Sequence, residues 1–298
     1  MNVLVTGSGG LVGSALVAEP RRAGIRVVRA VRRGATTEDG ARWDPVTGMI
    51  EGGPPVGAVV HLAGSSLNTR WTLERKREIE RSRIHATHGL CEWLARRPTP
   101  PATLVAASAM GIYGDGREAW LDESSPPGGD WLASVVERWE RAADPARSAG
   151  IRVVHARFGL VLSRRGGALP PMVRAFRWGL GGRLGSGRQY WSWIALPDVI
   201  AFLRRALEDA TLSGAVNVVS PEPVPQHEFA RQLGAALHRP AVLPAPAFAL
   251  RWLLGDMADA MILSSARVAP RRLREASFTW GYPELGDALR HALGEGAG

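Results

Sequence analysis

Residues 5–13 read VTGSGGLVG and follow a short apolar run at the start of the chain. The apolar run is typical of a buried strand, and the residues beyond the glycines have helical spacing. The first glycine permits a tight turn, the second lets the backbone approach a pyrophosphate, and the third allows close helix-to-strand packing. The stretch therefore predicts a βαβ unit with a dinucleotide at the helix N-terminus. The residues expected to contact it are Gly7, Gly10, Leu11, Val12 and Gly13.

Outward from this loop, β-like and helix-like segments alternate along the chain. Further strand patterns lie at 25–33, 57–64, 102–109, 151–162 and 214–220. The alternation predicts an α/β fold, a Rossmann-like doubly wound parallel sheet that binds ligands at the carboxyl ends of its strands. Because an interior proline disrupts a helix, the first helix is expected to kink or stop before Pro20.

Two regions break this rhythm. Residues 163–193 are rich in Gly, Arg and Trp, and residues 221–298 contain many prolines and two helical patterns. We expect them to form a smaller C-terminal α+β domain on the substrate side. The dinucleotide-binding domain would then comprise 1–162 and 194–220.

The composition is ordinary for a globular protein, with 45% hydrophobic and 22% charged residues among 298. The one cysteine, Cys91, excludes an intrachain disulfide and is compatible with a reducing compartment. The N-terminus does not resemble a signal peptide, and no apolar run is long enough to span a membrane. We therefore expect a cytoplasmic protein without a membrane partner, either a monomer or a homodimer.

The net charge is +9, and Lys76 is the single lysine among 37 basic residues. A basic chain can bind nucleic acid, but these arginines are scattered and do not alternate with aromatic residues. General surface charge is the favoured interpretation, with a few arginines left as candidates for anionic ligands. His85 and His88 lie three residues apart without a further ligand at a recognisable spacing, so no metal site is predicted.

The cofactor type depends on the end of the second predicted strand. NAD enzymes carry an acidic residue there for the ribose 2′-hydroxyl, whereas this chain has Arg32 and Arg33 and no acid before Glu38. Guanidinium groups suit a 2′-phosphate, so NADP (NADPH) is predicted. The alternative is that both arginines are solvated and that NAD binds.

Several segments together resemble a known family. The glycine pattern, LAG at 62–64 and SAMGIYG at 108–114 are similar to the extended short-chain dehydrogenases/reductases. More narrowly, the chain resembles an atypical epimerase-like branch with a C-terminal extension, and this resemblance runs over nearly its whole length. That resemblance implies a Rossmann domain, bound NADP(H) in contact with Leu62, Ala63 and Gly64, and a poorly defined substrate. The narrower resemblance rests on RWTLERKREIERSR (70–83), ERWE (137–140), GLGGRLGSGRQYWSWIALPD (179–198) and FTWGYPELGDAL (278–289).

The catalytic pair of that superfamily is missing. Its members use a tyrosine as acid/base and a lysine four residues later, but here every tyrosine follows the only lysine. Counted back from Glu140, the two positions fall near Leu132 and Val136, which are apolar. An unassisted tyrosine has a pKa near 10, a poor match to a base at neutral pH. The usual mechanism is therefore lost or rebuilt.

Candidates for a rebuilt site each have a structural alternative. Ser108 ends a strand where the superfamily keeps a hydroxyl beside the substrate carbonyl, but it could simply bond to the backbone. Tyr113 could reach the same cleft or belong to a structural turn. Glu78 and Arg83 lie on a charged helix that either is solvated or borders the cofactor. The resemblance places Arg83 on the inner side, so both are predicted near the nicotinamide half.

The substrate side has weaker signals. Gln189 and Trp193 offer an amide and a stacking surface, and Arg174 could receive a diphosphate or be an exposed helical arginine. The first functional hypothesis is an NADP(H)-dependent oxidoreductase or epimerase-like enzyme acting on a nucleotide-sugar or a small carbonyl or hydroxyl compound. The alternative is a non-catalytic module that senses NADP(H) redox state. A deep, polar-ended cleft beside the nicotinamide position would favour the enzyme.

Overall fold

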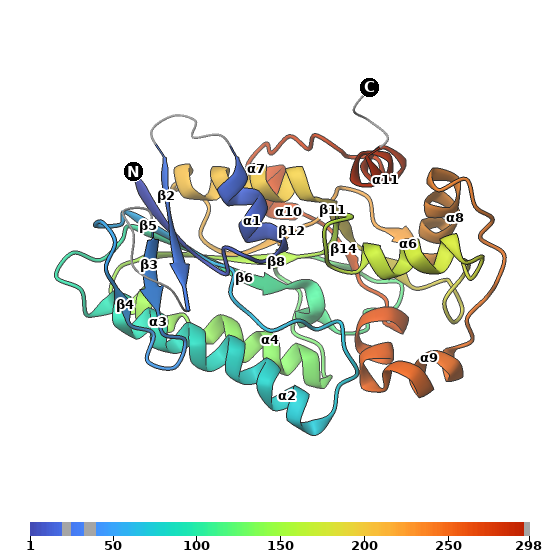
Figure 1. The fold of residues 1–298 in the computed structure, drawn as a ribbon, viewed down its shortest axis with the longest axis horizontal. Coiled ribbons are helices and arrows are strands. Elements are labelled where there is room, and N and C mark those ends of the chain that lie inside the picture. Colours follow the sequence, from blue (N-terminus) through green and yellow to red (C-terminus); the bar gives the residue numbers. More distant parts are fainter. Residues whose placement is uncertain (20–24, 33–39, 295–298) are drawn as a thin grey trace.

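The computed structural model describes residues 1–19, 25–32 and 40–294. Its centre is an eight-stranded sheet of order β12-β8-β6-β5-β1-β2-β3-β4, parallel except for the β3–β4 pair (Figure 1). The predicted doubly wound sheet is confirmed, although β3 and β4 were not anticipated from their short sequences. The strands are β1 (Asn2–Thr6), β2 (Arg26–Val31), β3 (Gly40–Trp43), β4 (Ile50–Glu51), β5 (Ala58–His61), β6 (Thr103–Ala109), β8 (Arg152–Phe158) and β12 (Gly214–Val218).

The strand order reverses between β1 and β5. The chain runs from β1 to β2 and β3 on one side, then returns to build β5, β6, β8 and β12 on the other. Loops that leave the carboxyl ends of β1 and β5 diverge there and open a crevice. The glycine loop follows β1, so the topology puts it at this switch point.

Helices cover both faces of the sheet (Figure 1). Alternate residues of β1 explain this, because Val3 and Val5 pack into one apolar cluster with Phe202, whereas Leu4 packs into another with Leu90. The first face carries α1 (Leu11–Ala18), α7 (Leu196–Glu208) and α10 (Arg271–Glu275); the second carries α2 (Leu73–Glu80), α3 (Ala86–Ala95), α4 (Trp131–Arg141) and α5 (Asp144–Ser148). Helix α1 ends before Pro20, as predicted.

A smaller group of elements lies beyond one edge of the sheet, on the right in Figure 1. Its apolar cluster joins Phe176, Phe229 and Leu289 from three helices. Leu273 of α10 is instead buried in the apolar cluster of the central sheet. The elements are α6 (Leu169–Arg177), α8 (Gln226–Ala236), α9 (Ala247–Leu254), the π-helix η3 (Ala258–Leu263), α11 (Leu285–Leu293), and the strand pairs β9 (Leu160–Leu162) with β11 (Trp193–Ala195), β10 (Tyr190–Trp191) with β13 (Val224–Pro225), and β7 (Trp120–Leu121) with β14 (Arg267–Val268).

The strand predicted at 151–162 is in fact two strands. β8 belongs to the central sheet, whereas β9 pairs with β11 outside it. The break is at Gly159, where an added Cβ would lie 2.8 Å from the Ser192 carbonyl oxygen. Close backbone approach therefore turns the chain from one sheet to the other. Within the described ranges, no helix has the length and apolar character needed to cross a membrane.

Candidate functional site

The glycine loop brings two backbones into contact at the switch point. Gly7 has a φ of +67°, and a Cβ added there would lie 2.7 Å from the Leu62 carbonyl carbon. A Cβ on Gly13 would lie 2.2 Å from the Gly7 carbonyl oxygen. The fold thus requires glycine at both positions. Gly9 and Gly10 differ. A Cβ added to Gly9 would meet no protein atom within 4 Å, and one added to Gly10 would meet only the Gly7 carbonyl oxygen, at 3.2 Å.

The first turn of α1 is suited to bind an anion. Gly10 is its N-cap and offers no side-chain hydrogen bond to the helix, so the first N–H groups keep their positive character. The side chains of Leu11 and Val12 support the loop, the former near Gly167 and the latter in the sheet cluster. An exposed cradle of backbone amides fits a dinucleotide pyrophosphate.

At the end of β2, Arg32 is exposed directly after the last strand residue. This is the position at which an arginine can reach a 2′-phosphate. Arg33, the second predicted arginine, lies outside the described residues.

Arg83 fixes the loop that follows β5. It lies in a π-helical turn, η1 (Arg81–His85), that joins α2 directly to α3. Its Nη2 donates to the Ser65 carbonyl at 3.0 Å, and an added Cβ on Gly64 would lie 3.4 Å from its Cζ. Burial and the charge of Arg75 lower the pKa of Arg83 to about 10. The side chain thus backs the loop of Leu62, Ala63 and Gly64, on the predicted inner side.

Glu78 lies on α2, one turn before Arg83. It is exposed and forms an ion pair with Arg75. Arg75 also donates to the carbonyl of Ser66. Through Arg75, Glu78 is linked to the loop that follows β5, and its contact with a cofactor stays a prediction.

Ser108, Glu140 and Arg157 form a buried polar cluster above the end of β6. Ser108 Oγ donates to Glu140 Oε1 at 2.6 Å, and Arg157 binds the same carboxylate through Nε at 2.8 Å and Nη2 at 2.9 Å. Burial would raise the pKa of Glu140, but the hydrogen bonds and charge of Arg157 outweigh it and lower the pKa. The cluster is therefore a bidentate ion pair that holds the serine hydroxyl.

Tyr113 completes the same network. Its hydroxyl donates to Asn217 Oδ1 at 2.7 Å and accepts from Arg157 Nη1 at 2.9 Å. Only 3% of the residue is exposed, and burial raises the pKa of the phenol to about 12. Both predicted catalytic hydroxyls are thus engaged with protein partners, and the geometry does not support Tyr113 as a base.

The two positions of the missing pair lie on α4, which Asp130 caps by accepting from the Ala133 N–H at 2.8 Å. Leu132 and Val136 are 5% and 1% exposed and join one apolar cluster. The helix face that would carry the pair is therefore apolar and buried. Leu132 also borders a cavity.

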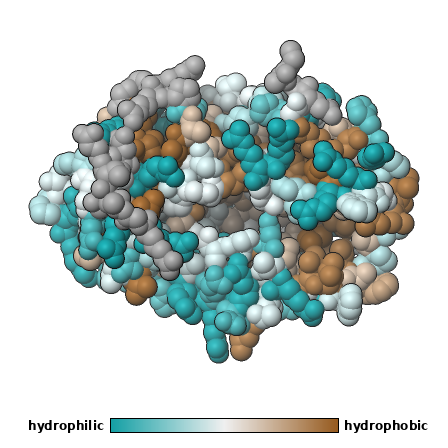
Figure 2. Space-filling view, viewed as in Figure 1, coloured by the Kyte–Doolittle hydropathy of each residue, from teal (hydrophilic) through white to brown (hydrophobic). Residues whose placement is uncertain are grey.

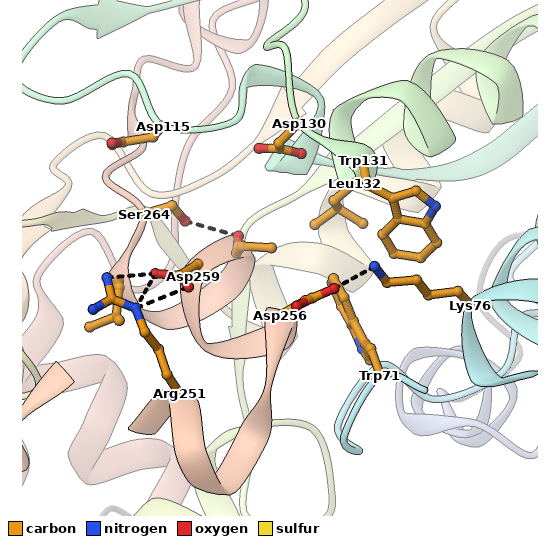
Figure 3. Close-up of a pocket in the computed structure, with 12 residues that line it drawn as sticks. Trp71, Lys76, Asp115, Asp130, Trp131, Leu132, Arg251, Asp256, Asp259 and Ser264 are labelled. Carbon is orange, nitrogen blue, oxygen red and sulfur yellow. Dashed lines mark hydrogen bonds and ion pairs between the residues drawn. The ribbon is translucent and has the colours of Figure 1, made fainter. Parts of the chain in front are cut away.

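That cavity has a volume of about 470 Å³ and lies between the sheet domain and the segment 251–264 (Figure 3). The start of α2 and the first turn of α4 form one side, and α9 with η3 forms the other. Figure 2 shows that the face viewed is hollowed near its middle. The residues that line the cavity are Trp71, Lys76, Asp115, Asp130, Trp131, Leu132, Arg251, Asp256, Asp259, Ala260, Leu263 and Ser264.

Carboxylates outnumber cations in this lining. Lys76 pairs with Asp256, and Arg251 pairs with Asp259 at 3.0 Å. Asp115 accepts only from backbone amides, including that of Ser265 at 3.0 Å, and Asp130 serves as the helix cap described above. These last two carboxylates have no ion pair among the described residues. The wall is therefore electronegative.

One cation and two aromatic rings complete the cavity. The ammonium of Lys76 lies 5.0 Å from the centroid of the Trp131 ring. Trp71 meets Trp131 edge to face, with 5.0 Å between ring centroids. The single lysine of the chain therefore lies in the lining of this cavity.

The three predicted substrate contacts lie elsewhere. Gln189 is 6% exposed and donates to the carbonyls of Leu184 and Ile262. Trp193 is 1% exposed and donates to the Glu222 carbonyl, while Arg174 is exposed on α6. None of the three lines the cavity: Gln189 and Trp193 are buried in packing, and Arg174 is a surface arginine.

The segment 251–264 carries half of the cavity but was not predicted to be part of it. Its apolar residues and helical spacing are ordinary, and the contact partner of Asp256 is 180 positions away in sequence. Across residues 1–19, 25–32 and 40–294, no group of three or more His, Cys, Asp or Glu side chains could hold a metal ion.

Known proteins resemble the chain over its full length. The family model described as NAD dependent epimerase/dehydratase family matches residues 3–219, and one described as a domain of unknown function, DUF1731, matches residues 245–292. The epimerase family protein Mb2239 of Mycobacterium bovis is 40% identical over 293 residues, which are 97% of each chain. The bovine (Bos taurus) epimerase family protein SDR39U1 is 36% identical over 98% of this chain and 100% of its own.

Among solved structures, human epimerase family protein SDR39U1 (isoform 2), crystallised with NADPH, superposes with a TM-score of 0.89. The two chains are 34% identical, and the match covers 99% of this chain and 100% of the human one. A nucleoside-diphosphate sugar epimerase of Corynebacterium glutamicum is also 34% identical, with a TM-score of 0.78 over 58% of its chain and 99% of this one. The glycine loop, the doubly wound sheet and the C-terminal extension thus agree with these comparisons, and the chain belongs to the NAD dependent epimerase/dehydratase family.

Proposed function

We propose that this protein binds NADP(H) across the switch point, with the pyrophosphate on the first turn of α1. The side-chain-free surface at Gly9 and Gly10 and the uncapped helix start support this position. Arg32 is the candidate partner of the 2′-phosphate. The NADPH found with the human relative, which is 34% identical over 99% of this chain, supports the choice of NADP(H).

The proposed activity is reduction or epimerisation of a small carbonyl or hydroxyl compound in the cavity beside Leu132. The observation that carries this proposal is the cavity itself, because a module that only senses a cofactor has no need of a polar-ended substrate site. The surplus of carboxylates disfavours a diphosphate, and Arg174 lies outside the lining. A substrate without negative charge fits better than a nucleotide-sugar.

Lys76 is the proposed proton donor. Bound NADPH would supply a hydride to a carbonyl carbon. The Lys76 ammonium would donate a proton to the carbonyl oxygen, which leaves a hydroxyl on the product and a neutral amine that solvent reprotonates. Lysine can lose a proton in this way, whereas arginine remains charged. Trp71 and Trp131 would hold the substrate against the wall at Leu132.

Cofactor titration followed by a carbonyl panel, monitored by NADPH absorbance, tests the proposal. We expect tighter binding of NADPH than of NADH, reversed in Arg32→Asp. On any substrate found, Lys76→Arg keeps the charge and should lower kcat about 100-fold with little change in KM. Arg77→Lys, at an exposed position of the same helix, is the control. Equal rates for Lys76→Arg and the wild-type protein would exclude the lysine as donor.

A second candidate function is NADP(H) redox sensing. The engagement of Ser108 and Tyr113 in the buried network favours it, because both hydroxyls are withdrawn from chemistry. The two functions differ in one readout. A sensor should oxidise no NADPH with any panel member, yet bind NADPH and NADP⁺ with affinities that differ about tenfold or more.

A further inference from the structure

Exposed apolar side chains concentrate on one side of the smaller group of elements. Phe248 and Trp252 project from α9 at i and i+4 and are 74% and 78% exposed. Leu253 of the same helix is 60% exposed. Trp178 and Leu180, at 78% and 62%, follow the end of α6. Apolar residues gather over α9 and at the right edge of the view in Figure 2.

Backbone hydrogen bonds hold the two segments side by side. The Leu243 N–H donates to the Gly181 carbonyl at 2.9 Å, and the Ala245 N–H donates to the Arg183 carbonyl at 2.9 Å. The chain after α6 therefore runs beside the chain that leads into α9. We call this surface the α6–α9 face; its apolar members are Trp178, Leu180, Leu243, Phe248, Trp252 and Leu253.

The same face carries unbalanced positive charge. Arg174, Arg177, Arg183 and Arg239 are exposed, and none forms an ion pair with a described residue. Residues 145–197 and 229–255 contain no Asp or Glu at all. These arginines therefore retain their charge next to the aromatic side chains.

Charge decides which occupant fits. A second copy docked by two-fold symmetry would bring arginine against arginine, which disfavours a homodimer here. Protruding Trp, Phe and Leu flanked by arginine are the composition of helices that lie in a bilayer interface rather than cross it. Anionic head groups would neutralise the arginines while the aromatic rings enter the acyl boundary.

In contrast to the sequence-based expectation of no membrane partner, we propose that the α6–α9 face docks this protein on an anionic lipid surface. The attachment is peripheral, since it uses side chains of a short helix and of an adjoining loop. It places the membrane beside the cavity, because Arg251 of α9 lines that cavity.

Vesicle flotation of the full-length protein tests this proposal. Phosphatidylcholine vesicles with and without about one third phosphatidylglycerol are compared at low salt and at about 0.5 M NaCl. We expect binding only to the anionic vesicles, weakened by salt. Phe248→Ser with Trp252→Ser should reduce binding about tenfold or more, and Arg174→Gln with Arg177→Gln several-fold.

Matched controls separate the face from general charge and hydrophobicity. Val46→Ser with Leu73→Ser removes two other exposed apolar side chains, and Arg77→Gln with Arg81→Gln removes one exposed arginine of α2 and one of η1. Both should bind as the wild-type protein does. Equal loss in the controls, or no binding to anionic vesicles at low salt, overturns the proposal; an acidic protein partner would then be the alternative occupant. A concentration-dependent dimer in light scattering that Phe248→Ser with Trp252→Ser dissolves would overturn it in favour of a second copy.

Discussion

Glu140 and Arg157 form an ion pair that holds the hydroxyl of Ser108, one of the two hydroxyls predicted to be catalytic. Their side chains are 13% and 9% exposed, so the pair is largely removed from water. The pair stays favourable because every polar group has a partner: Ser108 on one oxygen, Tyr113 on the guanidinium. At the scale of single residues, the polar cluster thus stabilises its own geometry instead of presenting a hydroxyl to substrate.

Glu140→Gln should be strongly destabilising. Removing one charge of a buried pair leaves the other without compensation, at a cost of about 3 kcal/mol in the free energy of unfolding. Glu137→Gln, which breaks a more exposed pair with Arg141 on the same helix, should cost about 0.5 kcal/mol or less. Urea denaturation of both variants measures the difference. Similar midpoints would mean that the buried pair contributes nothing specific.

At the scale of helices, strands and loops, three elements determine the shape of the site. The loop between β1 and α1 needs glycine both for its turn and for its exposed surface. Helix α4, capped by Asp130, carries apolar residues on the face that would bear a catalytic pair. The π-helical turn η1 directs Arg83 inward. Two of these elements therefore shape the cofactor cleft, while α4 forms a wall.

Gly10→Val should abolish cofactor binding while the fold survives. The added Cβ meets only the Gly7 oxygen, at 3.2 Å, but the methyl groups would fill the space above the first amides of α1. We expect NADPH affinity to fall at least about tenfold, since the phosphate loses that space. Gly129→Ala is the control, because its Cβ meets nothing within 4 Å. Unchanged affinity in a folded Gly10→Val protein would refute the cofactor placement.

Val136→Lys should destabilise the protein rather than restore chemistry. The position is 1% exposed within an apolar cluster, so the ammonium would be buried without a partner. We expect a loss of about 3 kcal/mol or more in unfolding free energy. Ser134→Lys, at an exposed position of the same helix, should change it by about 0.5 kcal/mol or less. A stable Val136→Lys protein in denaturant titrations would show that this wall is not packed as described.

In the whole molecule, two buried histidines lie on the central sheet. His61 of β5 contacts Thr6 and Thr87, and burial lowers its pKa to about 4. Burial likewise lowers the pKa of His155 on β8 to about 4, and Arg147 Nη2 lies 3.1 Å from its Nε2, which must be unprotonated to accept that bond. Both imidazoles are thus neutral in the folded state at neutral pH.

This pattern predicts loss of stability in mild acid. Because the folded pKa lies below the unfolded value near 6.5, the unfolded state binds more protons between pH 6.5 and 4. The contribution of each neutral histidine to the free energy of unfolding is complete above pH 6.5 and is about 2 kcal/mol smaller at pH 5. Urea denaturation at pH 7 and pH 5 measures the drop. His155→Gln should remove about half of it, whereas His88→Gln, on the surface of α3, should retain it all; an undiminished drop in His155→Gln would contradict this origin.

Local spacing was sufficient for part of this picture. The positive φ of Gly7, the packing of Gly13 against Gly7 and the cap at Asp130 each involve neighbours within a few residues, so the nucleotide-binding loop and the start of α4 could be predicted from the chain alone. The order of Lys76 before every tyrosine likewise excluded the usual catalytic pair without any structure. These features are local or purely sequential, and tertiary packing does not alter them.

Packing between distant segments decided the rest. The burial of Tyr113 against Asn217, the indole of Trp193 turned into the core, and the pairing of Lys76 with Asp256 join residues far apart in the sequence. An aromatic or charged side chain has the same pattern in the sequence whether it faces a cavity or a core. Only the tertiary contacts distinguish these cases, because they determine which side chains lose water and which partners compensate them. The cavity and the α6–α9 face therefore emerged only from the folded chain.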